Sequence, residues 1–269
     1  MTSKYVTEFC TPPYIPASER EIQLLKTADT FTVPFENNKI PCYKWGEGKT
    51  IVLAHGWSSR ASHWLFLART LVSAGYHVVA FDAPAHSSVN APSRKTSSNL
   101  FEFSRAISAV ANSLYHVHAI IGHSLGAAAA VFSLSGFPHL EANQIVVEKL
   151  VLISSPVSIA AIIQNFSKRY GLDPHETEIL KQGLEHDFQM NVDQYYIKDV
   201  LNQCKDTQVM VIHDKDDDQF PCHDIEQLHH INNQIILKIT EKLGHSQILT
   251  SRKVFKEILE FLNNQTCFP

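Results

Sequence analysis

Short, mostly apolar segments recur along this chain of 269 residues, and stretches with helical periodicity separate them. A short run that is apolar at every position fits a strand buried on both faces, which is typical of a parallel sheet. Strands that alternate with helices predict an α/β fold, with a mainly parallel sheet and helices on both faces. The segments predicted to be such strands are Thr50–Ala54, His77–Asp82, Val117–Ile121, Lys149–Ser154, Gln208–His213 and Ile235–Ile239.

The segments between these strands carry apolar residues at helical spacing. Ser18 followed by Glu21 forms a capping box, which predicts a helix start. Two further strands, Phe31–Phe35 and Ile40–Trp45, are expected before the first buried one. The helices predicted from apolar spacing cover Trp64–Ala74, Leu100–Leu114, Ala127–Leu134 and Val254–Leu262.

Residues 156–205 break the alternation, because they contain no strand pattern. Helical patterns cover Ser158–Ser167, His175–His186 and Val192–Asn202. We therefore expect a helical cap at 156–205, laid over the sheet of a core domain formed by 1–155 and 206–269. The aromatic residues of this segment either line a pocket or pack the cap onto the core; they are Phe166, Tyr170, Phe188, Tyr195 and Tyr196.

Composition excludes several classes of protein. The formal net charge of −4 indicates neither a nucleic-acid partner nor an anionic membrane. No apolar run is long enough to span a membrane, and the first residues lack the apolar core of a signal peptide. The odd number and irregular spacing of the cysteines favour neither disulfides nor zinc, so a cytoplasmic location is expected. The cysteines are Cys10, Cys42, Cys204, Cys222 and Cys267.

The segment Gly122–Gly126 reads Gly-His-Ser-Leu-Gly, which has the form G-x-S-x-G. It directly follows a buried strand and precedes an apolar helix. A sharp strand-to-helix turn exposes a serine hydroxyl, and it requires small residues on both sides. The pattern therefore predicts that Ser124 is a nucleophile.

Several segments, taken in order, resemble the α/β-hydrolase family over nearly the whole chain apart from 156–205. They are His55–Trp57, Phe81–His86, Gly122–Gly126, Ile212–Pro221 and Gly244–His245. The resemblance implies a serine hydrolase in which serine, acid and histidine follow one another along the chain.

Four aspartates compete for the role of the acid: Asp214, Asp216, Asp217 and Asp218. The family form D-x-x-[VIF]-P, which ends here at Pro221, selects Asp217. The other three are then loop-capping or solvated residues. A calcium loop starting at Asp214 fails, because Gln219 stands where glycine is required.

His245 is the predicted base, because it follows the last strand and precedes the last helix. His229 and His230 are rivals, but they lie in a helical stretch without a preceding glycine. Asp217 would orient the ring of His245 and stabilise its protonated form.

Two backbone N–H groups are expected to stabilise an oxyanion: those of Trp57 and Leu125. His55 and His123 are interpreted as structural residues beside them. The loop Asp82–Ser88 carries alanine and serine where the family form D-x-P-G-x-G-x-S has glycines, so its conformation is open.

The expected function is hydrolysis of a small or medium carboxylic ester through an acyl-serine intermediate. The alternatives are cleavage of a thioester, amide or C–C bond, or a non-catalytic ligand-binding protein of the same fold. The expected partner is a small-molecule substrate, and the oligomeric state is left open. No metal or cofactor is predicted, and the segment Gly46–Thr50 lacks the first glycine of a phosphate loop.

Overall fold

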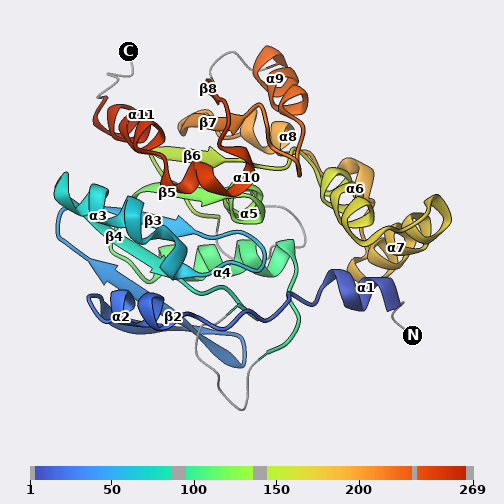
Figure 1. Cartoon of the computed structure of the whole chain (residues 1–269), viewed down its shortest axis with the longest axis horizontal. Coiled ribbons are helices and arrows are strands. Elements are labelled where there is room, and N and C mark those ends of the chain that lie inside the picture. Colours follow the sequence, from blue (N-terminus) through green and yellow to red (C-terminus); the bar gives the residue numbers. More distant parts are fainter. Residues whose placement is uncertain (1–3, 87–94, 136–143, 232–234, 265–269) are drawn as a thin grey trace.

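The computed structural model describes residues 4–86, 95–135, 144–231 and 235–264. Within these ranges the strands are β1 (Asp29–Phe35), β2 (Asn38–Trp45), β3 (Lys49–Ala54), β4 (Tyr76–Phe81), β5 (Val117–His123), β6 (Lys149–Ile153), β7 (Gln208–Asp214) and β8 (Ile236–Thr240). They form one eight-stranded sheet in the order β1-β2-β4-β3-β5-β6-β7-β8 (Figure 1). β2 pairs antiparallel with both β1 and β4, and every other neighbouring pair is parallel. The prediction of a mainly parallel α/β sheet is confirmed.

The middle strands are buried on both faces, as their apolar runs predict. Every residue of β5 and β6 is buried. Neighbouring residues of β5 enter different cores, because Ile120 packs into the cluster on one face and Ile121 into the cluster on the other. A fully buried side chain of this kind stabilises the fold by roughly 1.5–3 kcal/mol. Because successive side chains are buried on opposite faces, both faces of the sheet are anchored to a layer of helices.

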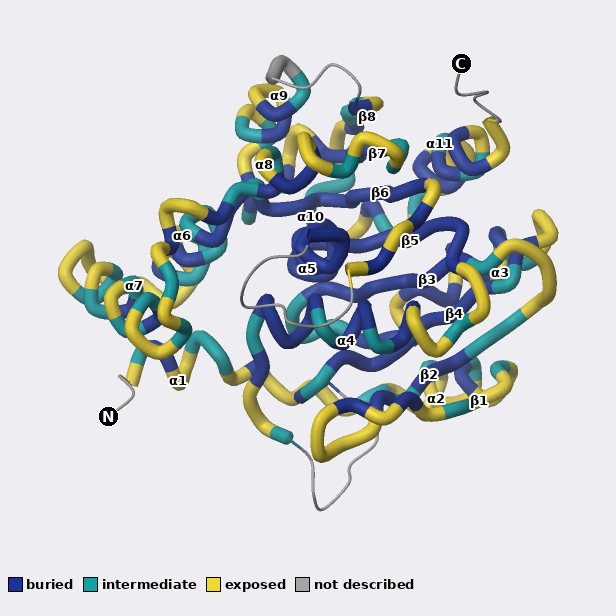
Figure 2. The backbone as a smooth tube through the Cα atoms, turned by 180° about the vertical axis from the view of Figure 1, so that it is seen from behind, coloured by how far each residue is buried: buried dark blue, intermediate teal, exposed yellow. Residues whose placement is uncertain are grey.

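Helices cover both faces of the sheet. Residues of α4, α5, α8 and α9 share one core, and residues of α3 and α11 share the other. Figure 2 shows the buried sheet between them. The α-helices are α1 (Lys4–Phe9), α2 (Glu19–Leu25), α3 (Leu65–Ser73), α4 (Leu100–Asn112), α5 (Leu125–Ser133), α6 (Ile159–Tyr170), α7 (Pro174–Phe188), α8 (Ile197–Leu201), α9 (Cys222–Ile231), α10 (Gly244–Gln247) and α11 (Arg252–Asn263). Three short 3-10 helices are η1 (Ala61–Trp64), η2 (Val192–Gln194) and η3 (Ile248–Thr250).

Local signals in the sequence placed several helix ends correctly. The capping box of Ser18 and Glu21 is present at the start of α2. The single helix predicted over Val192–Asn202 is wrong. The chain there is divided into η2 and α8, because Tyr196 is extended and forms a β-bridge with Ser158.

The segment between β6 and β7 is helical, and α6 and α7 lie at one end of the molecule beside α1 (Figure 1). The hydroxyl of Tyr5 on α1 donates to Glu176 of α7 at 2.7 Å, and the Phe9 ring lies 5.1 Å from that of Phe166. α8, in contrast, packs on α5. A division into a core of 1–155 and 206–269 and a cap of 156–205 stays a prediction. Among the described residues, no helix is long and apolar enough to cross a membrane.

Candidate active site

Ser124 lies at a sharp turn between β5 and α5. Its backbone angles are φ 53° and ψ −124°, a conformation that strains any residue with a Cβ atom. Its N–H donates to the carbonyl of Ile153 at 2.9 Å, and α5 begins at the next residue. The serine therefore stands at the carboxyl edge of the sheet and at a helix N-terminus, where backbone N–H groups are free.

Two glycines allow this turn to close tightly. A Cβ atom on Gly122 would lie 2.5 Å from the Cα of Ala127, and one on Gly126 would lie 2.3 Å from the carbonyl oxygen of His55. Both obstacles are backbone atoms, which cannot rotate away. The small flanking residues of the G-x-S-x-G pattern are therefore a steric requirement of this fold.

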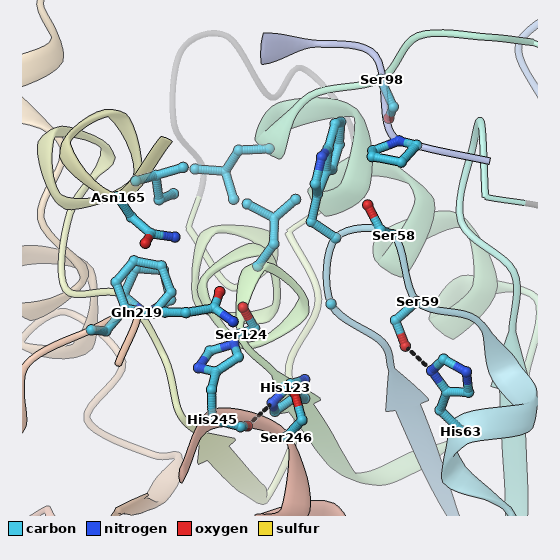
Figure 3. Close-up of a pocket in the computed structure, with 18 of the residues that line it drawn as sticks. Ser58, Ser59, His63, Ser98, His123, Ser124, Asn165, Gln219, His245 and Ser246 are labelled. Carbon is cyan, nitrogen blue, oxygen red and sulfur yellow. Dashed lines mark hydrogen bonds between the residues drawn. The ribbon is translucent and has the colours of Figure 1, made fainter. Parts of the chain in front are cut away.

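His245 lies in α10, the short helix after β8, and its ring lies beside Ser124 (Figure 3). Its Nδ1 is 2.8 Å from Oδ2 of Asp217. Because a carboxylate only accepts hydrogen bonds, Nδ1–H donates and Nε2 keeps its lone pair. The Ser124 hydroxyl makes no hydrogen bond to a described residue, although both side chains line one cavity. Contacts of this kind are often long in unliganded sites and tighten when substrate binds.

Asp217 is a buried carboxylate with several hydrogen-bond donors. Its Oδ1 accepts the backbone N–H groups of Gln219 at 2.9 Å and Phe220 at 3.0 Å, while Oδ2 accepts from His245. Burial acts to raise the pKa of Asp217, but the hydrogen bonds from His245 and from the two backbone N–H groups outweigh it and hold the pKa below its ordinary value. The side chain is therefore ionised at neutral pH and fixed in direction.

Two of the competing aspartates bind the loop that precedes the histidine. Asp214 accepts the backbone N–H groups of Gly244 at 3.0 Å and Leu243 at 3.2 Å, and Asp216 accepts that of Lys242 at 2.7 Å. They cap the loop, which is one of the roles that the sequence left open for them. Their contribution to positioning the histidine was not predicted, since it depends on contacts across the sheet edge.

The acid assignment is tested by replacing Asp217 with asparagine. An amide at this position no longer favours the Nδ1–H form of His245, so we expect kcat to fall by about 10³–10⁴. The matched control is Asp218→Asn, because Asp218 is exposed in the same loop. Steady-state kinetics on a chromogenic ester measures kcat for Asp217→Asn and for Asp218→Asn. Equal losses in both variants would show that the acid is assigned wrongly.

The backbone N–H groups of Trp57 and Leu125 donate no hydrogen bond to a described residue, and both residues line the cavity. Leu125 is the first residue of α5. The loop carrying Trp57 lies against the nucleophile, since a Cβ atom on Gly56 would come within 3.0 Å of the Cβ of Ser124. Two free donors therefore lie near Ser124, which agrees with the roles predicted for them; those roles stay a proposal.

His55 and His123 are buried and connect the loops around Ser124. Nε2 of His55 accepts the Ala83 N–H at 2.9 Å, so Nδ1 donates to the Gly56 carbonyl at 2.8 Å. His123 contacts the carbonyl of His245 through Nε2 at 2.8 Å, a contact in which the ring N–H donates. Burial lowers the pKa of each ring to about 3. Both are therefore neutral groups with structural contacts.

The lowered pKa values of His55 and His123 predict that the folded protein loses stability in mild acid. The unfolded chain takes up protons on them near pH 6.5, whereas the folded chain does so only near 3. The unfolded state thus binds more protons between these values, and stability falls as the pH falls below 6.5. Each contributes about 2 kcal/mol of this loss at pH 5. Urea unfolding at pH 7 and pH 5 measures it; NMR signals of protonated His55 and His123 rings in folded protein at pH 5 would contradict it.

The loop after β4 contains a residue in the left-handed backbone conformation that is alanine instead of glycine. Ala85 has φ 67°, in the left-handed region that favours glycine and costs other residues about 1–2 kcal/mol. The next residue, His86, is buried and its ring packs 4.8 Å from that of Trp57. The backbone conformation left open by the sequence is therefore known up to His86, while Ser87 and Ser88 lie outside the described residues.

A cavity of about 700 Å³ lies over Ser124 and is lined by α2, α3, α6 and α7 as well as by the loops of the sheet edge. Its size matches sites that enclose small organic ligands. Ser124 and His245 lie in its wall, with Asn165 and Gln219 beside them (Figure 3). The arrangement therefore brings the residues predicted to be the nucleophile and the base, together with two free N–H donors, to one cavity.

The aromatic residues of 156–205 divide between the two roles considered for them. Phe166, Tyr170 and Phe188 line the cavity, whereas Tyr195 is buried in the core. Phe9 and Pro13 also line the cavity, which no pattern in the sequence indicated. They reach it because the N-terminal segment runs from α1, which packs on α7, to α2.

The chain matches the alpha/beta hydrolase family over residues 51–236, which is more than half of its length. It therefore belongs to the α/β-hydrolase family, as its motifs predicted. Family membership supports a general hydrolase class. No curated protein matches the chain.

Solved structures share this fold. An esterase of Pyrococcus furiosus has a TM-score of 0.66 and 20% identity, covering 94% of this chain and 95% of that one. An esterase from Exiguobacterium antarcticum has a TM-score of 0.61 and 18% identity, covering 87% and 99%. A thioesterase domain from the curacin biosynthetic pathway has a TM-score of 0.61 and 17% identity, covering 88% and 99%. At these identities the likeness concerns the fold.

Proposed function

We propose that the protein is a serine hydrolase that cleaves a small or medium carboxylic ester through an acyl-serine intermediate. The observation that carries the proposal is the 2.8 Å pair of His245 Nδ1 and Asp217 Oδ2, with the ring beside the strained Ser124. A paired, correctly tautomeric histidine next to a serine at a helix N-terminus is an activated nucleophile.

In the first half of the reaction, Ser124 Oγ attacks the ester carbonyl carbon while its proton passes to Nε2 of His245. The C–O bond to the alcohol then breaks, and His245 returns the proton to the departing alkoxide. In the second half, a water molecule gives a proton to Nε2 of His245 while its oxygen attacks the acyl carbon. The bond from that carbon to Ser124 Oγ then breaks, and His245 returns the proton to Oγ. The products are the carboxylic acid and free Ser124.

Negative charge develops on the carbonyl oxygen in each half. In the proposal, the N–H groups of Trp57 and Leu125 hold this oxyanion. Donors that are already fixed before reaction require no reorganisation, and one such donor typically accounts for about 10²–10³ in kcat. Asp217, ionised by its hydrogen bonds, stabilises the protonated ring of His245.

Other bonds remain alternatives, because the same three side chains also serve thioester, amide and C–C cleavage. Likeness to the two esterases favours the ester, and likeness to the thioesterase domain favours the thioester. A non-catalytic ligand-binding protein is the third alternative. A strained serine beside a carboxylate-paired histidine argues against it, since binding alone requires neither.

Matched substrates test the proposal. We expect hydrolysis of para-nitrophenyl butanoate to exceed that of the corresponding anilide by several orders of magnitude, with a preference for acyl chains that fit the cavity. A series of para-nitrophenyl esters of increasing chain length, with Ser124→Ala as the control, measures both. Faster cleavage of a butanoyl thioester than of its oxygen ester would favour the thioester alternative. If Ser124→Ala releases para-nitrophenol at the wild-type rate, the serine mechanism is ruled out.

A further inference from the structure

The cavity over Ser124 has two chemically different ends. Asn165 and Gln219 lie on one side of the serine, and Ser59 and His63 lie on the other (Figure 3). The first side is covered by apolar side chains of α6 and α7, including Ile159, Ile162, Phe166, Leu184 and Phe188. The second side is lined by α2, the loop before η1, η1 and α3, which also contribute Leu24, Leu65 and Phe66. We call it the polar end after its polar residues, which are Arg20, Glu21, Ser59, Ser62, His63 and Arg69.

The two arginines of the polar end come from neighbouring helices. Arg20 stands in the first turn of α2, beside Glu21, whose carboxylate reaches His63 at 3.3 Å. Arg69 stands on α3, and it shares with Leu24 of α2 the wall of a second, smaller cavity. Both arginines therefore belong to the same end of the main cavity.

Glu21 is the single carboxylate among the described residues that line the cavity, and its oxygens are already used. Oε1 accepts from Ser62 Oγ at 2.7 Å, and Oε2 accepts from the backbone N–H and hydroxyl of Ser18 at 2.8 Å. Burial acts to raise the pKa of Glu21, but these hydrogen bonds and the Arg60 guanidinium 4.0 Å away lower it to about 2. Glu21 is thus a satisfied anion and leaves the arginines of the polar end without an acid.

Neither Arg20 nor Arg69 forms an ion pair within the described parts of the chain. Both side chains are exposed, in a protein whose net charge is −4. A guanidinium group presents N–H donors in a fork that matches a carboxylate or a phosphate. The polar end therefore carries two unpaired guanidinium groups, whereas the side covered by α6 and α7 is apolar apart from Asn165 and Arg169 of α6.

We propose that the natural ester carries an anionic group, a carboxylate or a phosphate, on its alcohol part, and that Arg20 and Arg69 bind this group. The acyl chain then lies against the apolar side chains of α6 and α7, and the carbonyl lies at Ser124 between the two ends. This inference rests on the proposed hydrolase function and adds the class of substrate.

The test compares esters that share the acyl chain and the aromatic ring and differ in the charge of the para substituent. The butanoate esters of para-hydroxybenzoate and para-hydroxybenzamide share the acyl chain and the ring, and the butanoate ester of para-hydroxyphenyl phosphate supplies the phosphate arm. We expect kcat/KM for an anionic ester to exceed that for the amide by about tenfold, a size consistent with two exposed charge pairs. Added salt should reduce this ratio, since it screens exposed charges.

Variants identify the residues responsible. The double variant Arg20→Gln/Arg69→Gln should reduce the anionic-to-neutral ratio to about one. The matched control is Arg252→Gln, because Arg252 is an exposed arginine outside the cavity wall and should leave the ratio unchanged. A ratio near one in the wild-type protein, or an unchanged ratio in the double variant, would overturn the proposal.

A binding measurement separates this inference from the enzymatic proposal. Para-hydroxybenzoate and para-hydroxybenzamide are not esters, so calorimetry measures their affinity for the wild-type protein without turnover. We expect the benzoate to bind about tenfold more tightly, with the difference lost in the double variant. Equal affinities would refute the anion site even if esters are hydrolysed. A clear difference without any ester hydrolysis would support the anion site and refute the hydrolase proposal instead.

Discussion

Replacing Ser124 with alanine is expected to lower kcat for para-nitrophenyl butanoate by about 10⁴–10⁶, with little change in KM. The variant lacks the attacking oxygen but keeps the cavity, the N–H groups of Trp57 and Leu125, and the pair of His245 and Asp217. Steady-state kinetics measures the loss. The activity that remains in the variant should come from substrate binding in the cavity and from the N–H groups of Trp57 and Leu125.

The comparison requires that the variant stays folded. The Ser124 side chain makes no hydrogen bond to a described residue, so its removal leaves no partner unsatisfied, and we expect an unchanged unfolding midpoint. A folded Ser124→Ala protein that retains a tenth or more of the wild-type kcat would contradict the role of the serine.

Replacing Gly126 with alanine is expected to destabilise the fold by more than about 4 kcal/mol, or to prevent folding. The added Cβ atom would lie 2.3 Å from the carbonyl oxygen of His55 and 2.4 Å from that of Ala54. Both carbonyls belong to the end of β3 and the loop after it, which are buried and cannot move without disturbing the sheet. The free energy of unfolding from urea titration, together with the yield of folded protein, measures the effect.

Gly171 provides the matched control, because it differs from Gly126 in the space around it. A Cβ atom on Gly171 would meet nothing within 4 Å, although its φ of +67° disfavours alanine. We expect Gly171→Ala to cost about 1 kcal/mol, the typical penalty of a left-handed residue. Similar losses in both variants would show that the close approach at Gly126 is not what requires glycine.

Features that depend on neighbouring residues were predictable from the sequence. The strands β5 and β6 are recognisable because their central residues, Ala119–Ile121 and Leu150–Ile153, are apolar on both faces. The turn at Ser124 is recognisable because backbone contacts restrict its flanks to glycine. The order of the motifs along the chain then indicated the family, and the family match confirms it.

Features that depend on distant contacts were not predictable. The capping of the loop before His245 by Asp214 and Asp216 joins the ends of β7 and β8, which no local pattern reveals. Phe9 reaches the cavity only because α1 packs on α7. The extended Tyr196 that interrupts a helical pattern is likewise due to a bridge to Ser158, far away in the sequence.

Residue type alone also does not tell which aspartate is the catalytic acid. Four aspartates stand within five positions of the sequence; the family form selected Asp217, and the fold distinguishes all four by what they contact. Asp217 faces the His245 ring, Asp214 and Asp216 face backbone N–H groups, and Asp218 is exposed. The assignment of Asp217 as the catalytic acid stays a prediction until the variants Asp217→Asn and Asp218→Asn are compared.

Covalent labelling measures most directly whether Ser124 is an activated nucleophile. Intact-protein and peptide mass spectrometry after treatment with a fluorophosphonate should find one adduct, on the peptide that contains Ser124, in the wild-type protein and none in Ser124→Ala. An unlabelled wild-type protein, beside an active serine esterase that reacts fully in the same tube, would contradict the account. So would an adduct on any other residue.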